Sequence, residues 1–200
     1  MTLTKFLEIL AILVGALSGF AEARNKRMDV AGVFIVAFIT AFGGGTLRDI
    51  LLDKRPLFWV QHQEYAILIA VLSLVATPVL NASNKFLPPR LIIVADALGL
   101  GLFSVVGAST ALEAGMPVFI ASMMGVISGI FGGVMRDIIC NEVPLVLRDN
   151  RPYAICAFAG CWMYLGMQYV GVSPDFSLWM SALTISAIRL VTWAKDIRLG

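Results

Sequence analysis

The sequence predicts an all-α integral membrane protein with seven transmembrane helices, arranged as two inverted three-helix repeats followed by a seventh helix. Its composition is the first reason: 59% of the residues are apolar and 14% are charged, whereas a soluble domain has about 45–50% and about 25%. Apolar runs of nearly twenty residues are the second reason, since a helix needs that length to cross a bilayer core of about 30 Å. We predict these helices at residues 3–22, 30–51, 64–81, 91–112, 117–139, 153–172 and 176–194.

An internal duplication is the third reason. When the chain is shifted by 88 residues, positions 44–67 fall on positions 132–155 with ten identities and no gap. We therefore place the first repeat at residues 1–87 and the second at 88–172, and residues 173–200 hold the seventh helix and a short tail. Each repeat has three helices, an odd number, so the second repeat enters the membrane from the opposite side. Inverted repeats of this kind place their functional site near the middle of the bilayer.

The first helix, at 3–22, has some features of a secretory signal peptide, because a basic residue precedes an apolar run. We expect it to stay in the mature protein for three reasons. Glu8 interrupts the start of the run, Arg24 and two further basic residues follow it at once, and it aligns with the helix at 91–112 of the second repeat.

The helices at 30–51 and 117–139 carry the strongest functional signal. Polar and small side chains recur at every fourth position, which places them along one helix face. This stripe contains Thr40, Gly44 and Arg48 in the first repeat, and Ser128, Gly132 and Arg136 in the second. A hydroxyl group, a bare backbone and a cation on one line would suit the wall of a hydrated path, because each can replace water around a passing ion or polar solute.

A neighbouring face of the same two helices carries small residues and ends in an aspartate. It reads Ala37, Ala41, Gly45 and Asp49 in the first repeat, and Gly125, Gly129, Gly133 and Asp137 in the second. Ladders of small residues let helix backbones approach closely. Arg48 and Asp49 are neighbours in sequence and therefore point in different directions on a helix, so we predict that their partners lie elsewhere.

The glycines admit two interpretations. Each costs about 1 kcal/mol in a helix interior relative to alanine, so something must offset the cost. The helices could kink or break beside a water-filled cavity, or they could simply pack closely. The Arg-Asp pair at the same offset in both repeats favours the first interpretation. The predicted kinks then lie at Gly43, Gly44, Gly45, Gly132 and Gly133.

Two carboxylates also coincide under the shift of 88 residues. Glu8 and Asp96 lie a few residues inside the first and fourth helices. They could pair with the arginines or attract cations at the mouths of a pore. They could equally be interfacial carboxylates in contact with water among the lipid headgroups.

The remaining helices are simpler. The helices at 64–81 and 153–172 begin near Tyr65 and Tyr153, after a Pro-Leu pair that shapes the preceding turn in each repeat. The helix at 176–194 has no counterpart in the repeats. Trp179 and Trp193 suit interfacial anchors near its ends, and Arg189 can extend its charged group toward the cytoplasmic headgroups.

The distribution of lysine and arginine predicts the orientation. Seven helices put the termini on opposite faces of the membrane. One face holds three basic residues, Lys5, Lys54 and Arg55, and the other holds nine, Arg24, Lys26, Arg27, Lys85, Arg90, Arg148, Arg151, Lys195 and Arg198. By the positive-inside rule the second face is cytoplasmic. The N-terminus is therefore predicted outside and the C-terminus in the cytoplasm, and the basic loops could also bind anionic lipid.

The sequence gives no support for an enzyme. His62 stands alone in a loop, and Cys140, Cys156 and Cys161 have neither metal-ligand nor redox spacing. We see no histidine-rich metal cluster, no Ser-His-Asp set and no phosphate-binding loop in the sequence. We expect no cofactor, no metal and no nucleic-acid partner.

Two three-helix inverted repeats and a seventh helix, with GGGTLRD in the first copy and GGVMRD in the second, resemble a prokaryotic trimeric intracellular cation (TRIC) channel. The resemblance covers essentially the whole chain. It implies an inner-membrane homotrimer in which each protomer has its own pore for potassium and sodium, bounded by the kinked second and fifth helices. It also implies that Arg48 and Arg136 are pore or gate residues. The Lys-Glu-Val motif of animal members has no place in this sequence.

Bacterial proteins of this type are also grouped under a glycine-transporter name, and a secondary transporter of a small zwitterion is the alternative function. An arginine could then hold the carboxylate of the solute, while glycine-broken helix ends hold both of its charges. In a channel, an arginine paired with a carboxylate can gate the path, and carboxylates at the mouths can restore cation preference. The residues alone do not separate these two functions.

Overall fold

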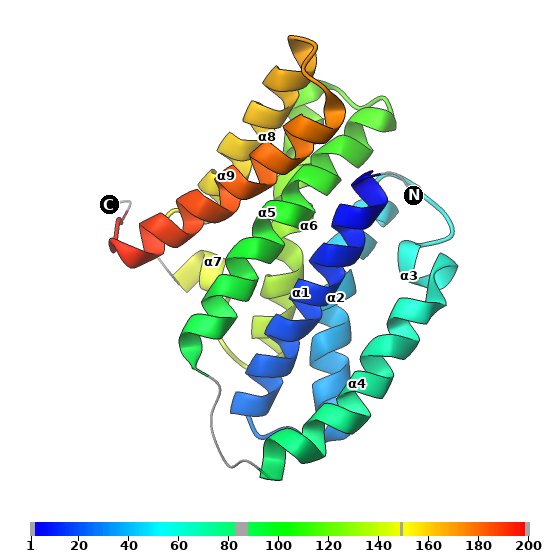
Figure 1. Cartoon of the computed structure of the whole chain (residues 1–200), viewed down its shortest axis with the longest axis vertical. Coiled ribbons are helices and arrows are strands. Elements are labelled where there is room, and N and C mark those ends of the chain that lie inside the picture. The colour runs from blue at the N-terminus through cyan, green and yellow to red at the C-terminus, as the bar shows by residue number, and fades with distance from the viewer. Residues whose placement is uncertain (1–2, 83–87, 149, 199–200) are drawn as a thin grey trace.

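The computed structural model describes residues 3–82, 88–148 and 150–198, and these residues form a bundle of helices (Figure 1). The long helices are α1 (Leu3–Asn25), α2 (Val30–Leu51), α4 (Gln63–Ala82), α5 (Pro89–Glu113), α6 (Val118–Ile139), α8 (Ala154–Tyr169) and α9 (Pro174–Ala194). The short helices are α3 (Phe58–Gln61) and α7 (Leu145–Arg148). Lys85 and the predicted repeat boundary at 87/88 lie outside the described residues.

A long helix lies at each of the seven predicted places, and the all-helical membrane fold is confirmed. Among the described residues, five helices are long and apolar enough to cross a membrane: α1, α2, α5 from Arg90, α6 and α9. The apolar part described for α4, Gln63–Val75, is shorter, and α8 has only 16 residues. The number of helices that cross the bilayer therefore stays a prediction.

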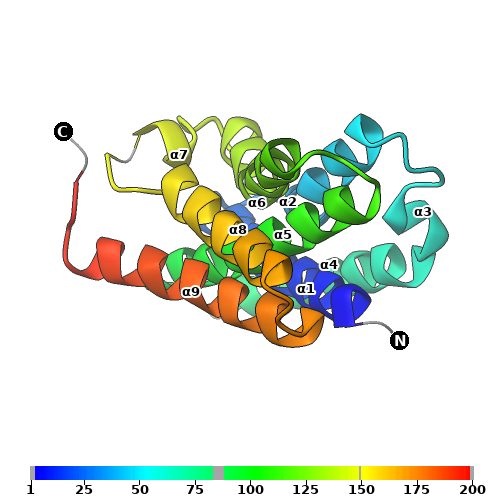
Figure 2. The ribbon, with the colours of Figure 1, turned by 90° about the horizontal axis from the view of Figure 1, so that it is seen from above.

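The helix α5 occupies the middle of the bundle, where it packs against α1, α6 and α9 (Figure 2). The first repeat packs α1 on α2, and the second packs α5 on α6 in the same way. These contacts use the predicted small-residue ladder. A Cβ atom added to Gly19 would lie 2.6 Å from the Cα atom of Ala37, and one added to Gly15 would lie 3.2 Å from that of Ala41. The small residues therefore bring helices of one repeat together.

The two repeats meet where α2 crosses α6. A Cβ atom added to Gly44 would overlap the carbonyl oxygen of Ser128, and one added to Gly132 would lie 2.5 Å from the carbonyl oxygen of Thr40. The Cα atom of Gly132 is also 3.6 Å from a Cβ atom added to Gly43. The contact is reciprocal, as an inverted duplication requires, and only glycine lets the backbones come this close.

This contact corrects one expectation. The assigned α-helix runs without a break through Gly43–Gly45 in α2 and through Gly132–Gly133 in α6. The helices are not interrupted at these glycines. At Gly44 and Gly132, close backbone packing offsets the cost of glycine. A smoother bend of the helices remains a prediction.

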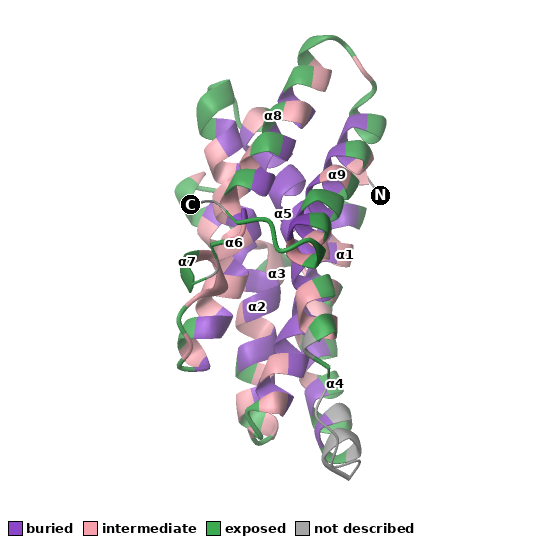
Figure 3. Ribbon diagram, turned by 90° about the vertical axis from the view of Figure 1, so that its left-hand side faces the viewer, coloured by how far each residue is buried: buried purple, intermediate pink, exposed green. Residues whose placement is uncertain are grey.

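The buried residues lie mainly on the inward faces of the helices (Figure 3). Many large apolar residues are nevertheless exposed. Side chains such as Ile12, Val36 and Leu100 fill the interior. Large apolar side chains are exposed along α4, among them Leu68, Leu72 and Leu74. Apolar patches of this extent suit contact with lipid or with another membrane-embedded surface.

Candidate functional site

The first buried charge cluster, which we call the Arg48 cluster, consists of Glu8, Arg48 and Asp49. Arg48 is 2% exposed. Its Nη2 donates to Oε1 of Glu8 at 2.6 Å, and its Nε donates to Oδ1 of Asp49 at 2.8 Å. Asp49 in turn accepts a hydrogen bond at 3.4 Å from the backbone N–H of Phe58, the first residue of α3. Two carboxylates and one guanidinium give the cluster a formal charge of −1.

The second, the Arg136 cluster, repeats this pattern with Asp96, Arg136 and Asp137. Arg136 is 3% exposed. Its Nε donates to Oδ1 of Asp137 at 2.9 Å, and its Nη1 donates to Oδ1 of Asp96 at 3.1 Å. Asp137 accepts from the backbone N–H of Leu145, the first residue of α7, at 2.8 Å. This cluster also has a formal charge of −1.

The two clusters lie on opposite sides of the α2–α6 crossing. Gly44 meets Ser128 and Gly132 meets Thr40, so the two helices run antiparallel. Each arginine follows its glycine by one helical turn, which carries Arg48 and Arg136 away from the crossing in opposite directions. Glu8 and Asp96 occupy equivalent positions in the two repeats. Each forms an ion pair with the arginine of its own repeat.

The pairing of each arginine with the next residue corrects our expectation that sequence neighbours do not meet. Adjacent side chains diverge by about 100° around a helix, but the arginine stem is long enough to turn back. Buried guanidinium groups need hydrogen-bond acceptors because water is excluded. The aspartates are held in reach by the N–H groups that begin α3 and α7.

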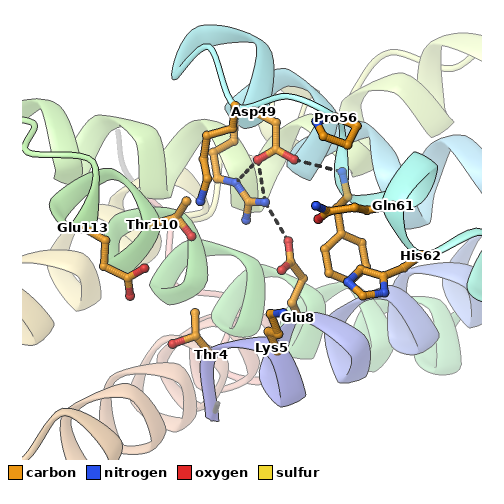
Figure 4. Close-up of a pocket in the computed structure, with 12 residues that line it drawn as sticks. Thr4, Lys5, Glu8, Asp49, Pro56, Gln61, His62, Thr110 and Glu113 are labelled. Carbon is orange, nitrogen blue, oxygen red and sulfur yellow. Dashed lines mark hydrogen bonds and ion pairs between the residues drawn. The ribbon is translucent and has the colours of Figure 1, made fainter. Parts of the chain in front are cut away.

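The Arg48 cluster borders a cavity of about 230 Å³, which we call the large cavity because the two cavities linked to it in series are much smaller (Figure 4). Figure 4 shows Glu8 and Asp49 at its centre, with Thr110 and Glu113 of α5 on one side and His62 on the other. The lining includes both signs of charge. It consists of Thr4, Lys5, Glu8, Arg48, Asp49, Lys54, Pro56, Phe58, Gln61, His62, Thr110 and Glu113.

Two smaller cavities are linked to the large one, in series, by shared lining residues. A cavity of about 10 Å³ shares Glu8 and Phe58 with the large cavity and extends to Phe103. A cavity of about 20 Å³ is also lined by Phe103 and reaches Asp96. A single water molecule needs about 10–15 Å³ of this volume. The cavity near the Arg136 cluster therefore has room for about one water molecule.

The predicted polar stripe is only partly beside these cavities. Thr40 and Gly132 line the 20 Å³ cavity, whereas Gly44 is pressed against Ser128 at the crossing. The hydroxyl group of Thr40 donates to the carbonyl oxygen of Val36 at 2.6 Å. The hydroxyl group of Ser128 is buried and has no hydrogen-bond partner in the described part of the chain.

Gly45 and Gly133 have a different role from the crossing glycines. A Cβ atom added to Gly45 would lie 3.9 Å from Glu8 and 3.8 Å from Arg48. One added to Gly133 would lie 3.2 Å from Asp96 and 3.8 Å from Arg136. At Gly45 the added atom would make ordinary contacts, whereas at Gly133 it would press on Asp96, so Gly133 leaves room for the ion pair beside it.

The chain is similar to several known proteins. A family profile described as glycine transporter matches residues 5–81 and 93–169. The inner membrane protein YadS of Escherichia coli is 37% identical over 197 residues, covering 98% of this chain and 95% of that protein. A membrane protein of Vibrio cholerae is 33% identical over 189 residues, covering 94% of this chain and 78% of that protein.

Solved structures decide the family. The TRIC trimeric intracellular cation channel orthologue from Rhodobacter sphaeroides matches with a TM-score of 0.90 and 29% identity, covering 98% of this chain and 100% of that one. A second TRIC cation channel matches with a TM-score of 0.80 and 32% identity, covering 98% and 95%. The chain belongs to the TRIC family. In this TRIC member, the Gly-Gly and Arg-Asp motifs supply the helix crossing and both buried clusters.

Sequence reasoning missed several residues of this TRIC chain. Ser18 accepts a hydrogen bond from Nη1 of Arg136 at 2.6 Å, and Tyr153 donates one to Oδ2 of Asp96 at 2.6 Å. The identity of Tyr65 and Tyr153 in the two repeats was the signal available for Tyr153. Ser18 has no such signal, because the shift of 88 residues pairs it with Val106.

Arg189 also differs from its prediction. It is 1% exposed and its guanidinium carbon lies 4.6 Å from the ring centre of Tyr153. The side chain therefore turns into the protein and does not extend to the headgroups. A buried aromatic face and a backbone carbonyl attract a guanidinium group strongly where water is excluded.

Proposed function

We propose that this chain forms a channel for monovalent cations, potassium and sodium, with one conducting path in each protomer of a homotrimer in the inner membrane. From the distribution of lysine and arginine, we also propose that the N-terminus lies outside and the C-terminus in the cytoplasm. The single observation that carries the proposal is the pair of buried clusters, each with a formal charge of −1, on opposite sides of the α2–α6 crossing. Carboxylates at both ends of a path favour cations over anions.

The path that we propose follows the chain of cavities. It enters at the large cavity, passes Glu8, reaches Phe103 and continues to Asp96. The packing of Gly44 against Ser128 leaves no space directly between α2 and α6. The path therefore runs beside the crossing, lined by residues of α2 and α6 together with residues of α1 and α5. With cavities of about 10 and 20 Å³, the arrangement corresponds to a closed channel.

The comparisons support a cation channel and a trimeric assembly. The solved relatives are described as trimeric intracellular cation channels and as TRIC cation channels. The likeness extends over 98% of the chain in both cases. The exposed apolar side chains of the long helices offer surfaces on which lipid and neighbouring protomers could pack.

The first experiment is single-channel recording of the purified protein in a planar bilayer under a potassium chloride gradient. We expect unitary currents of about 10⁷ ions per second or more, far above the rate of any μs–ms conformational cycle. The reversal potential should show cation preference. Absence of currents from well-folded protein would contradict the proposal.

A charge-neutral variant sharpens this experiment. Glu8→Gln changes the formal charge of the Arg48 cluster from −1 to zero and should lower the potassium-to-chloride permeability ratio several-fold. One charge about 10 Å away contributes on the order of 1–2 kcal/mol at an effective dielectric constant near 20. Asp175→Asn at the start of α9, an exposed carboxylate away from the cavities, is the matched control and should leave the ratio unchanged.

One observation favours the alternative, a secondary transporter of a small zwitterion such as glycine. The large cavity carries both signs of charge, and the buried Nη1 of Arg48 has no hydrogen-bond partner in the described part of the chain. The family profile is also described as glycine transporter. Uptake of labelled glycine into liposomes by protein that gives no unitary currents would favour this function, and Arg48→Lys should then weaken the uptake.

A further inference from the structure

The helix α9 brings a buried cation to the Arg136 end of the molecule. Arg189 lies over the ring of Tyr153, with 4.6 Å between the guanidinium carbon and the ring centre. Its Nη1 also donates to the carbonyl oxygen of Pro152 at 3.4 Å. Arg189 thus contacts two consecutive residues immediately before α8, so the position of that tyrosine depends on α9.

Tyr153 connects this cation to the Arg136 cluster. Its hydroxyl group donates to Oδ2 of Asp96 at 2.6 Å, and Oδ1 of the same carboxylate accepts from Arg136 at 3.1 Å. All four side chains are buried. A continuous series of polar contacts therefore runs from α9 through the start of α8 and α5 to α6.

The Arg48 end lacks this connection. Tyr65 occupies the position of Tyr153 in the first repeat, but its ring stacks on Phe58 with 6.1 Å between ring centres. In the described part of the chain, no hydrogen bond joins Tyr65 to Glu8, the counterpart of Asp96. Both repeats have the tyrosine, and among the described residues a guanidinium group packs on Tyr153 but none is found on Tyr65. The difference follows from α9, which has no counterpart in the duplication.

We propose that Arg189 is a positioning residue for the gate at the Arg136 end, acting through Tyr153. By fixing the tyrosine ring, it holds Asp96 in its pair with Arg136 and stabilises the closed arrangement. In this arrangement the cavity beside Asp96 has a volume of only about 20 Å³. The inference rests on the proposed channel function and adds that the seventh helix controls opening at one end of the path.

The test is a double-mutant cycle in single-channel recordings. Arg189→Met removes the cation, and Tyr153→Phe keeps the ring but removes the hydroxyl donor. Each change should raise the open-to-closed ratio roughly fivefold or more, the scale of a typical coupling between sites, with little change in unitary conductance. The double variant should show no further increase, because both changes interrupt the same series of contacts.

Two further variants distinguish positioning from general packing. Arg189→Lys keeps a cation above the ring and should restore part of the closed-state preference. Tyr65→Phe is the matched control in the first repeat, and its effect should simply add to that of Arg189→Met. Additive effects of Arg189→Met and Tyr153→Phe, or altered conductance with an unchanged open-to-closed ratio, would overturn the role of Arg189.

The two proposals fail in different ways. A wild-type protein that gives no currents contradicts the channel, and with it any gate. Currents from the wild type together with additive mutant effects leave the channel in place and contradict only the role of Arg189. Thermal unfolding in detergent of the wild type, Arg189→Met, Tyr153→Phe and the double variant provides a second double-mutant cycle. Coupling there without coupling in the open-to-closed ratio would make the contacts structural and would contradict the gating role.

Discussion

A buried arginine must find acceptors for its N–H groups, and the two motif arginines do so in unequal ways. Arg136 has three partners, Asp96, Asp137 and Ser18, whereas the Nη1 of Arg48 is left without one in the described part of the chain. An unpaired buried donor costs about 1–3 kcal/mol. The Arg48 cluster is therefore the less fully satisfied of the two, and it is the one beside the large cavity.

Phe103 lines both small cavities, and its replacement tests the proposed path. Phe103→Leu removes the ring while keeping the position apolar. We expect a higher conductance or open probability in bilayer recordings, because the narrowest apolar part of the path becomes wider. Phe20→Leu, the same substitution at a buried residue of α1 that lines none of the cavities described above, is the control. Equal currents from the wild type and Phe103→Leu would place the path elsewhere.

At the level of single residues, the sequence predicted which charges matter better than it predicted their partners. The repeat identified Glu8 and Asp96 as possible partners of the arginines, since they recur at equivalent positions. It could not predict the contact of Arg189 with Tyr153, because that contact joins α9 to another helix and has no equivalent in the first repeat. Such contacts depend on how helices cross, and helix periodicity carries no information about that.

At the scale of helices, two kinds of helix contact account for much of the glycine pattern. Gly44 and Gly132 are needed because each faces a backbone carbonyl group of the opposing helix. Gly15 and Gly19 bring α1 to α2 within the first repeat. The two faces predicted from the sequence thus serve different contacts: the small-residue ladder joins helices within a repeat, and the glycines of the polar stripe face the other repeat.

Alanine substitutions separate these requirements. Gly44→Ala and Gly132→Ala should each lower the thermal stability of the protein in detergent, since forcing an extra carbon into a tight contact costs about 1–3 kcal/mol. Gly166→Ala in α8, where an added Cβ atom would have no neighbour within 4 Å, is the matched control. It should leave stability unchanged or raise it, because alanine favours helix. Equal stability of all three variants would contradict the tight crossing.

The helix positions were predictable from the sequence and the short helices were not. Apolar runs placed α1, α2 and α6 within a few residues of their observed bounds, because hydrophobic length decides where a membrane helix lies. The four-residue helices α3 and α7 depend instead on aspartates that accept their first N–H groups. The predicted break of the helices at the glycines was wrong. A pattern of glycines alone does not show whether they interrupt a helix or let it pack closely on another.

At the scale of the whole molecule, the repeats are also joined at a loop. Lys26, between α1 and α2, donates to Glu142, which follows α6. Arg148 of α7 donates to the same carboxylate at 3.2 Å. Hydrogen bonding to Lys26 lowers the pKa of Glu142 below its ordinary value of 4.5, and hydrogen bonding to Glu142 raises the pKa of Lys26 above 10.5.

These two shifts define a pH range for the link. A lowered carboxyl pKa means that the stabilisation is complete above pH 4.5 and is lost as the pH falls through the lowered pKa. A raised lysine pKa means that it is complete below pH 10.5 and is lost as the pH rises further. The link should therefore hold at neutral pH.

Thermal unfolding of the wild type and of Glu142→Gln as a function of pH checks this expectation. The variant should be slightly less stable at neutral pH, since partly exposed ion pairs contribute little. The difference should shrink in acid as Glu142 gains a proton in the wild type. Asp175→Asn, an exposed carboxylate of α9, is the control. A stability difference that persists in strong acid would show that Glu142 acts through packing and not through its charge.

The arrangement of the ion pairs also has a consequence for biosynthesis. The residues of each long-range pair are 40 positions apart, Glu8 with Arg48 and Asp96 with Arg136, so each pair closes between two successive helices. An arginine entering a bilayer alone costs about 2.5–3.5 kcal/mol on scales from translocon insertion. Its carboxylate partner has already been synthesised when the arginine leaves the ribosome, and insertion can proceed with the two charges together. Each half of the chain can therefore neutralise its own arginine before the halves meet.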